Sequence, residues 1–290
     1  MKGIIIVDKP REFTSFDVVA VMRGLLRTKK VGHGGTLDPM ATGVLPVFVG
    51  GATKAVDILP DSDKGYRAGF ELGYTSDTLD IWGELAGSGT AEVSREALER
   101  ALEKFRGDIM QVPPMYSALK VNGQKLCDLA RKGISVERKP RPVRISRLDC
   151  TEFDGRKGVI EVDCSSGTYI RSLIDDIGAE LGTGAVMTSL VRTRACGFDL
   201  SRSTPLEAFK SMGYEELCGK ILPVESVFSA LSRVELDEVQ KRLYLNGVRL
   251  DADRLLSRPP ADEPCAVYGG EFLGVAMVTG GELVSVKRFS

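Results

Sequence analysis

The alternation of apolar and polar residues predicts a mixed set of strands and helices. Residues 66–72 and 159–164 alternate as half-buried strands do, whereas 18–26 and 94–105 carry apolar residues at helical spacing. Thr14, Ser15 and Asp17 precede the first of these helices as candidate N-caps, and Ser94 precedes the second. Further helices are expected over 169–181, 206–212, 214–218 and 237–245, a strand over 187–194, and a meander of three strands over 265–289.

A glycine-rich stretch, residues 31–46, interrupts this pattern. Four glycines and two prolines in sixteen residues prevent one continuous helix or strand, so a shaped loop is expected, followed by the apolar run 44–49. The stretch contains the single histidine of the chain, His33, and an aspartate, Asp38. A loop that leads into a buried strand is a common place for reactive side chains, but a tight turn capped by Asp38 explains the pattern equally well.

Composition indicates a soluble protein. The chain has 290 residues, 43% of them hydrophobic and 27% charged, which allows a large domain with a small appendage. No apolar run reaches the roughly 18 residues of a membrane span, and the apolar start is too short for a signal peptide. Six widely spaced cysteines without a C-x-x-C pair argue against a disulfide framework or a zinc site and favour a reducing cytoplasm.

Charge is distributed unevenly, although the net charge is only −1. Residues 71–103 carry eight acidic and two basic side chains, whereas 104–147 carry eleven basic and three acidic ones. A basic segment in a neutral protein is typical of a surface that binds a polyanion, with a merely solvated charged face as the alternative. The irregular stretch 111–142 lies within this segment and is expected to extend from the core as a functional loop.

Motifs of several enzyme classes are absent: there is no G-x-S-x-G elbow, no Walker loop and no strand-linked G-x-G-x-x-G. Asp77 and Asp80 could suggest a two-carboxylate glycosidase, although Asp-x-x-Asp beside glycines is more often turn chemistry. A Ser-His-Asp hydrolase would have to use His33. The residues by themselves therefore indicate only an aspartate in a rigid loop and a basic surface suited to nucleic acid.

Several motifs in order resemble those of the TruB-type tRNA pseudouridine synthases. The segment 32–45, GHGGTLDPMATGVL, resembles the active-site motif of this family. The other matching blocks are Asp8-Lys9-Pro10 with Thr14-Ser15, Lys64-Gly65-Tyr66, 73–83, 113–120, 164–171 and 190–194. Together the blocks cover about residues 3–225. The sequence departs from the family pattern at Glu12, where glycine is usual, Gly34, where threonine is common, Ser76, where threonine is usual, and Cys127, where an aromatic residue is frequent.

The resemblance implies a reaction and the residues that perform it. The T-loop uridine at tRNA position 55 would be detached from its sugar at N1, turned, and rejoined through C5, without a cofactor or a metal. Asp38 matches the catalytic aspartate, and Arg171 matches the arginine that pairs with it. Tyr66 matches the tyrosine that stacks on the target base, Tyr169 and Leu190 match other walls of the uracil pocket, and His33 matches a histidine that meets the RNA. Attack at C1′ and removal of the C2′ proton both remain open.

The expected architecture is an α+β pseudouridine synthase fold with a central mixed, largely antiparallel sheet. Residues 1–230 would form the catalytic domain, with 111–142 as a thumb-like RNA-binding insertion, and 231–290 a PUA-like C-terminal module. The residues expected to contact RNA phosphates are Arg131, Lys132, Arg138, Lys139 and Arg141. The expected partner is the tRNA T-arm, with no membrane and no obligate protein partner, in the cytoplasm. The alternative is a non-catalytic T-arm-binding protein or tRNA-folding chaperone. A degenerate active site would favour this alternative, whereas Asp38, Tyr66 and Arg171 are all present.

Overall fold

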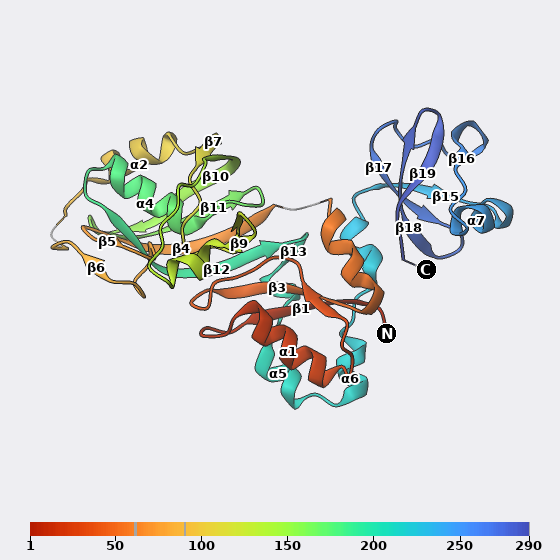
Figure 1. Cartoon of the computed structure of the whole chain (residues 1–290), viewed down its shortest axis with the longest axis horizontal. Coiled ribbons are helices and arrows are strands. Elements are labelled where there is room, and N and C mark those ends of the chain that lie inside the picture. Colours follow the sequence, from red (N-terminus) through yellow and green to blue (C-terminus); the bar gives the residue numbers. More distant parts are fainter. Residues whose placement is uncertain (61–62, 90, 290) are drawn as a thin grey trace. The chain divides into compact units, whose positions relative to one another are not determined.

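The computed structural model describes residues 1–60, 63–89 and 91–289, and these form two compact units (Figure 1). Unit 1 comprises Met1–Pro39, Val44–Ser62 and Cys196–Ser290, and unit 2 comprises Met40–Gly43 and Asp63–Ala195. Neither unit is one continuous stretch of chain. Each unit is therefore assembled from segments that are distant in sequence.

Unit 2 is built on a largely antiparallel sheet. Its strands lie in the order β12 (Ala185–Ala195), β4 (Lys64–Leu72), β11 (Lys157–Cys164), β10 (Arg141–Phe153) and β7 (Gly107–Gln111). The four pairs between these neighbours are all antiparallel. Thr42–Gly43, the start of β3 (Thr42–Val49), runs parallel to β12, so the sheet is mixed. The strands expected over 66–72, 159–164 and 187–194 are confirmed and extended.

Two helices accompany this sheet, α2 (Arg95–Glu103) and α4 (Ile170–Glu180). Helix α4 packs against β12 and β4 and contacts α2 (Figure 1). Its buried residues include Leu173, Ile174 and Ile177, whose spacing places them on one face. The Ser94 hydroxyl accepts a hydrogen bond from the backbone nitrogen of Ala97, as expected of the N-cap of α2.

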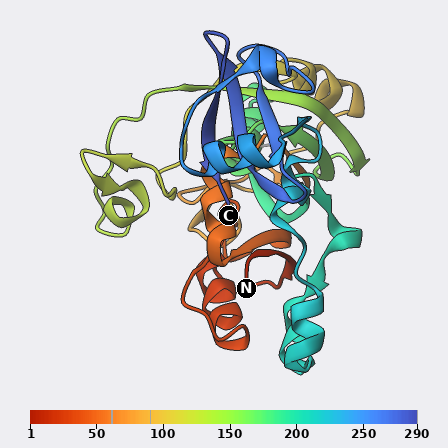
Figure 2. The same cartoon turned by 90° about the vertical axis from the view of Figure 1, so that its right-hand side faces the viewer.

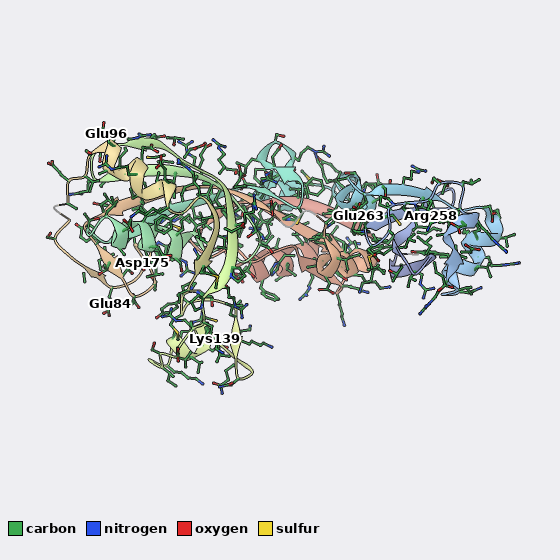
Figure 3. All side chains as sticks on the ribbon, turned by 90° about the horizontal axis from the view of Figure 1, so that it is seen from above. Glu84, Glu96, Lys139, Asp175, Arg258 and Glu263 are labelled. Atoms are coloured by element: carbon green, nitrogen blue, oxygen red, sulfur yellow. The ribbon has the colours of Figure 1, made fainter. Side chains whose placement is uncertain are left out.

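The segment between β7 and β10 projects from unit 2, as Figures 2 and 3 show; Figure 3 labels Lys139 within it. We call residues 111–142 the thumb. Within it, β8 (Lys120–Val121) and β9 (Gln124–Lys125) form a hairpin that leads into α3 (Leu126–Ala130). The thumb is therefore less irregular than its composition suggests. Asn122 and Gly123 both have positive φ, which a two-residue hairpin turn requires.

The N-terminal part of unit 1 combines β1 (Gly3–Lys9), β2 (Val31–His33), β3 and β14 (Thr204–Pro205) with three helices. The helices are α1 (Ser15–Leu25), α5 (Leu206–Ser211) and α6 (Tyr214–Gly219). Thr14 caps α1, and a reciprocal bond from its backbone nitrogen to Asp17 completes a capping box. The apolar core of this part is Ile5, Val7, Val18, Val19, Met22, Leu26, Val31, Leu45, Val47, Val49, Leu206, Phe209 and Leu217.

The C-terminal part of unit 1 is a five-stranded sheet with its own apolar core. Its strands lie in the order β15 (Ser232–Glu235), β17 (Pro264–Tyr268), β18 (Phe272–Thr279), β19 (Glu282–Arg288) and β16 (Leu250–Asp251). The expected three-stranded meander is confirmed as β17–β19, and β15 and β16 extend it on either side. Helix α7 (Glu238–Leu245) contributes Tyr244, which is fully buried in this core.

Candidate active site

Asp38 lies in unit 1, on the loop that follows β2, and the backbone beside it is anchored on both sides. On one side, the backbone nitrogen of Leu37 donates to the Ser15 hydroxyl at 2.8 Å. On the other, the Pro39 carbonyl accepts a bond from the backbone nitrogen of Glu12 at 2.8 Å. Asp38 itself is only partly buried. Its backbone is thus held in place while its side chain keeps some access to solvent.

A buried lysine, Lys9, also holds the Asp38 loop through hydrogen bonds. Lys9 is fully buried, and its Nζ donates to the carbonyls of Pro10 at 2.9 Å, Phe13 at 2.5 Å and Pro39 at 3.4 Å. An ammonium carries three donors, and three carbonyls surround it here. Since one of these carbonyls belongs to the residue after Asp38, Lys9 joins the Asp8-Lys9-Pro10 motif to the aspartate loop.

Two positions that depart from the family pattern lie in this region, and the structure explains why glycine is usual at the first and present at the second. Glu12 adopts a left-handed backbone conformation with φ of +70°, which glycine adopts without a steric cost. At Gly34, an added Cβ would lie 2.8 Å from Cε2 of Phe48 and 3.1 Å from Sγ of Cys196. The Phe48 ring and the Cys196 thiol therefore fill the space that a larger residue would need.

His33 ends β2 and is partly exposed on the same loop. Its Nδ1 accepts a bond from the backbone nitrogen of Gly35 at 3.3 Å. The ring of Phe16 meets it edge to face, with 5.4 Å between centroids, and Phe16 is 66% exposed. Phe16 was not among the residues expected at the site, although it follows directly after the Thr14-Ser15 motif.

Unit 2 contains the other residues expected at the site. Tyr66 lies on β4, opposite Val162 of β11 and Arg192 of β12. Leu190 lies on β12, and both Tyr66 and Leu190 are buried to more than 90%. Tyr169 is the N-cap residue of α4, and Arg171 lies in the first turn of that helix. The paired strands β4 and β12 therefore carry Tyr66 and Leu190, and the start of α4 carries Tyr169 and Arg171.

Arg171 is almost completely buried, with 4% of its surface exposed, and its contacts fix the orientation of its guanidinium group. Nη1 donates to the Thr78 carbonyl and Nη2 to the Tyr116 carbonyl, both at 2.9 Å. Nε lies 3.9 Å from Oδ2 of Asp80, a carboxylate that is itself buried. A guanidinium held by a carboxylate and two carbonyls has little rotational freedom.

Asp80 is a further functional candidate, although its sequence pattern favoured a turn. It does shape a turn, since Oδ1 accepts from the Thr78 hydroxyl at 2.7 Å and from the backbone nitrogen of Trp82 at 3.0 Å. Its other oxygen faces Arg171. Its position in the matched block 73–83 was the one sequence signal for a role beyond the turn. The pairing with Arg171 was not visible, because the two residues are far apart in the chain.

The thumb residues expected to contact RNA divide into two groups. Arg131, Lys132, Lys139 and Arg141 are exposed, and Arg131 lies 3.6 Å from Asp128 in an exposed ion pair. Arg138 differs because it is partly buried and its Nη1 donates to the Pro113 carbonyl at 3.1 Å. We therefore expect Arg138 to support the thumb itself, whereas the other four residues remain candidates for phosphate contacts.

Across residues 1–60, 63–89 and 91–289, no group of three or more His, Cys, Asp or Glu side chains is arranged to hold a metal ion. Among the same residues, no helix is long and apolar enough to cross a membrane. The six cysteines are free thiols.

Comparison with known proteins identifies the family of the chain. Residues 23–170 match the model of the TruB family pseudouridylate synthase N-terminal domain, and residues 171–229 match that of the tRNA pseudouridylate synthase B C-terminal domain. The chain is 43% identical to the tRNA pseudouridine synthase B of Clostridium tetani over 96% of each chain. It is 46% identical to that of Stutzerimonas stutzeri, over 99% of this chain and 95% of the relative.

Solved structures show the fold. A Cbf5-Nop10-Gar1 complex contains a chain with a TM-score of 0.77 and 26% identity, over 99% of this chain and 85% of that one. An archaeal Nop10-Cbf5 complex gives a TM-score of 0.74 at 25% identity, over 99% and 86%. The expected α+β fold, with a central mixed sheet and a C-terminal β-rich module, is confirmed. The chain belongs to the TruB family and is a tRNA pseudouridine synthase.

Proposed function

We propose that this enzyme isomerises the T-loop uridine at tRNA position 55 and that Asp38 is its catalytic residue. The observation that carries the proposal is the anchoring of the Asp38 loop by Ser15, Lys9 and Glu12. Catalysis requires that a reacting group be held in a defined position before the substrate arrives. A turn that merely capped backbone amides would not need a buried lysine beneath it.

Chemistry at the sugar needs an ionised carboxylate, either to attack C1′ or to remove the C2′ proton. We assign Arg171 to pair with Asp38 during the reaction, because a guanidinium favours the charged form of a carboxylate. Asp80 and the carbonyls of Thr78 and Tyr116 hold this arginine within unit 2. Asp80 thus acts on the reaction through Arg171.

The substrate base would have to leave its stack for its sugar to reach the partly buried Asp38. We assign Tyr66 to stack on it, with Tyr169 and Leu190 forming other walls of its pocket, and His33 to contact the RNA beside it. Tyr66 and Leu190 are fixed on neighbouring strands β4 and β12, which gives a rigid surface for a planar base. The thumb would bind the T-arm through Arg131, Lys132, Lys139 and Arg141.

The domain assignment follows the same reasoning. Residues 1–230 would provide the catalytic domain and residues 231–290 a PUA-like RNA-binding module. The separate core of β15–β19 supports a module that folds around its own apolar residues. No cofactor takes part in the proposed reaction, and a cytoplasmic location suits a tRNA substrate.

The test is tritium release from a T-arm transcript whose uridines carry tritium at C5. Pseudouridine formation exchanges this hydrogen, so release at one equivalent per transcript is expected. A matched transcript with cytidine in place of uridine at position 55 should release nothing from that position. Equal release from both transcripts would overturn the assignment of the target, and binding without release from either would favour the non-catalytic T-arm-binding alternative.

A further inference from the structure

The start of the thumb is fastened to the first turn of α4 by hydrogen bonds from Gln111, Arg171 and Ser172, and Gln111 and Ser172 have no role in the proposed reaction. We call residues 111–116 the thumb root. Gln111, the last residue of β7, is 2% exposed. Its Oε1 accepts from the backbone nitrogen of Tyr169 at 2.8 Å, and its Nε2 donates to the Tyr169 carbonyl at 3.1 Å. One side-chain amide therefore holds both backbone groups of Tyr169.

Two more bonds join the same two segments. The Ser172 hydroxyl, 4% exposed, donates to the carbonyl of Val112 at 3.1 Å. Nη2 of Arg171 donates to the carbonyl of Tyr116 at 2.9 Å. Three of the four residues from Tyr169 to Ser172, namely Tyr169, Arg171 and Ser172, are thus bonded to the thumb root.

The helix start depends on these bonds. Tyr169 is the N-cap residue of α4 but makes no side-chain capping bond, and the helix has no acidic residue in its first turn. The Tyr169 carbonyl accepts the first intrahelical bond, from the Leu173 nitrogen at 3.0 Å, and a further constraint on its backbone comes from outside the helix. Gln111 supplies that constraint with a rigid planar amide that matches both the donor and the acceptor of one peptide backbone residue.

We propose that Gln111 is a positioning residue for pseudouridine formation: it fixes Tyr169 and, through the first turn of α4, the guanidinium of Arg171. Ser172 supports the same arrangement through Val112. The thumb root and the first turn of α4 then move as one body, so that the part of the thumb that binds RNA begins from a fixed base. This inference rests on the proposed roles of Tyr169 and Arg171.

The test compares Gln111→Met with wild type. Methionine keeps the length and volume of the side chain but removes both bonds, and it leaves the Tyr169 backbone groups without this partner. We expect the single-turnover rate at saturating tRNA to fall by about ten- to hundredfold, as for other small misplacements of reacting groups. The dissociation constant for tRNA should change less than about threefold, since phosphate contacts supply most of the affinity.

A stability-matched control separates positioning from general loss of structure. Leu98 is fully buried on α2, and Leu98→Ala creates a cavity in unit 2 at a position that makes none of these bonds. Both variants are measured well below their melting temperatures. The inference predicts a rate loss in Gln111→Met at least several times larger than in Leu98→Ala. Equal losses in the two variants would overturn it.

Ser172→Ala provides a second variant if Gln111→Met fails to fold. It removes the bond to Val112 with a small change in volume. We expect a smaller rate loss, about three- to tenfold, again with little change in tRNA affinity. If both variants fold, unchanged turnover in both would contradict the proposal. If Gln111→Met does not fold, unchanged turnover in Ser172→Ala alone would contradict it. Absence of tritium release from the wild-type enzyme would instead refute the proposed function.

Discussion

The Ser15 hydroxyl and the backbone of Leu37 share two hydrogen bonds: the Leu37 nitrogen donates at 2.8 Å, and the hydroxyl donates to the Leu37 carbonyl at 3.4 Å. Both residues are buried, and Ser15 begins α1. The capping box formed by Thr14 and Asp17 fixes the start of that helix. Through Ser15, a rigid helix end therefore determines the position of the residue that precedes Asp38.

Replacing Ser15 with alanine should loosen the Asp38 loop without unfolding the protein. The buried Leu37 nitrogen would lose its partner, at a cost of about 1–3 kcal/mol in the free energy of unfolding. We expect turnover to fall more than tRNA affinity, because the loop carries the catalytic group. Chemical denaturation measures the stability change, and single-turnover tritium release measures the rate. A rate equal to wild type would show that this bond does not position Asp38.

Replacing Asp38 with asparagine should abolish pseudouridine formation. The amide has a similar shape but cannot act as a nucleophile or a base at neutral pH. Binding of tRNA, measured by filter retention, should remain within a few-fold of wild type, since it depends mainly on phosphate contacts. Turnover near the wild-type rate in a folded Asp38→Asn variant would exclude the proposed role.

Replacing Arg171 with lysine should reduce turnover strongly, although the charge is kept. Lysine cannot reproduce the planar fork that reaches Thr78, Tyr116 and Asp80 together. The ammonium would also leave buried carbonyls without their partners, so a loss of about 1–3 kcal/mol in stability is expected. Circular dichroism must show an intact fold before rates are compared. A well-folded variant with normal turnover would make Arg171 dispensable.

Neutralising exposed thumb residues should change the salt dependence of tRNA binding. Each phosphate contact contributes roughly 0.7–0.9 to the slope of log affinity against log salt concentration. Replacing Arg131, Lys132 and Lys139 with glutamine should therefore flatten the slope by about 2–3 if all three touch phosphates. A matched control replaces the exposed Arg202, Lys210 and Lys220, which lie outside both the thumb and the C-terminal module, with glutamine. An unchanged slope in the thumb variant would indicate a merely solvated surface.

Asp176 should make stability depend on pH in an unusual direction. Burial, reinforced by the nearby Asp175 carboxylate, raises the pKa of Asp176 to about 6. Because the folded pKa lies above the usual value of 3.8, the folded state holds this proton more tightly than the unfolded chain between pH 4 and 6. Stability contributed by this group therefore falls as the pH rises through that window and stays lower above it.

Replacing Asp176 with asparagine should accordingly raise the melting temperature at pH 7.5, by about 2–4 °C for a protein of this size. The difference from wild type should shrink as the pH falls from 6 towards 4, and it should vanish well below pH 3.8, where the carboxyl group is protonated in both states. Thermal melts across this range measure the effect. A difference that does not vary with pH would show that desolvation of the carboxylate is not its cause.

Much of the fold could be predicted from sequence because local signals and burial agree. The predicted helix with Ser94 as its N-cap corresponds to α2, and Asp237 begins α7 through a capping box. Strand β10 was not anticipated. Its exposed arginines at 141, 144 and 147 do not recur with a period of two, and a register shift lies between Ile145 and Arg147, so the alternation was obscured. The thumb hairpin was missed for another reason, because the Asn122-Gly123 turn joins strands of only two residues each.

The site was predictable only in part. Asp38 and Arg171 could be named because motifs match the family, whereas hydrophobic patterning left their roles open. The contacts that hold Arg171 come from Thr78, Asp80 and Tyr116, which are distant from it in the chain. Gln111 gave no signal, because an amide in a short strand has no typical pattern and its partner lies 58 residues away.

The pairing of β1 with β14 has a consequence for folding during synthesis on the ribosome. Val7 pairs with Thr204, and Ile4 pairs with Leu222, so the first strand waits for partners that are synthesised about two hundred residues later. Until then, the apolar segment Ile4–Val7 has one strand edge without its final neighbour, an arrangement prone to aggregation. We expect nascent chains that stall before residue 204 to bind chaperones, and those released beyond Leu222 to escape them.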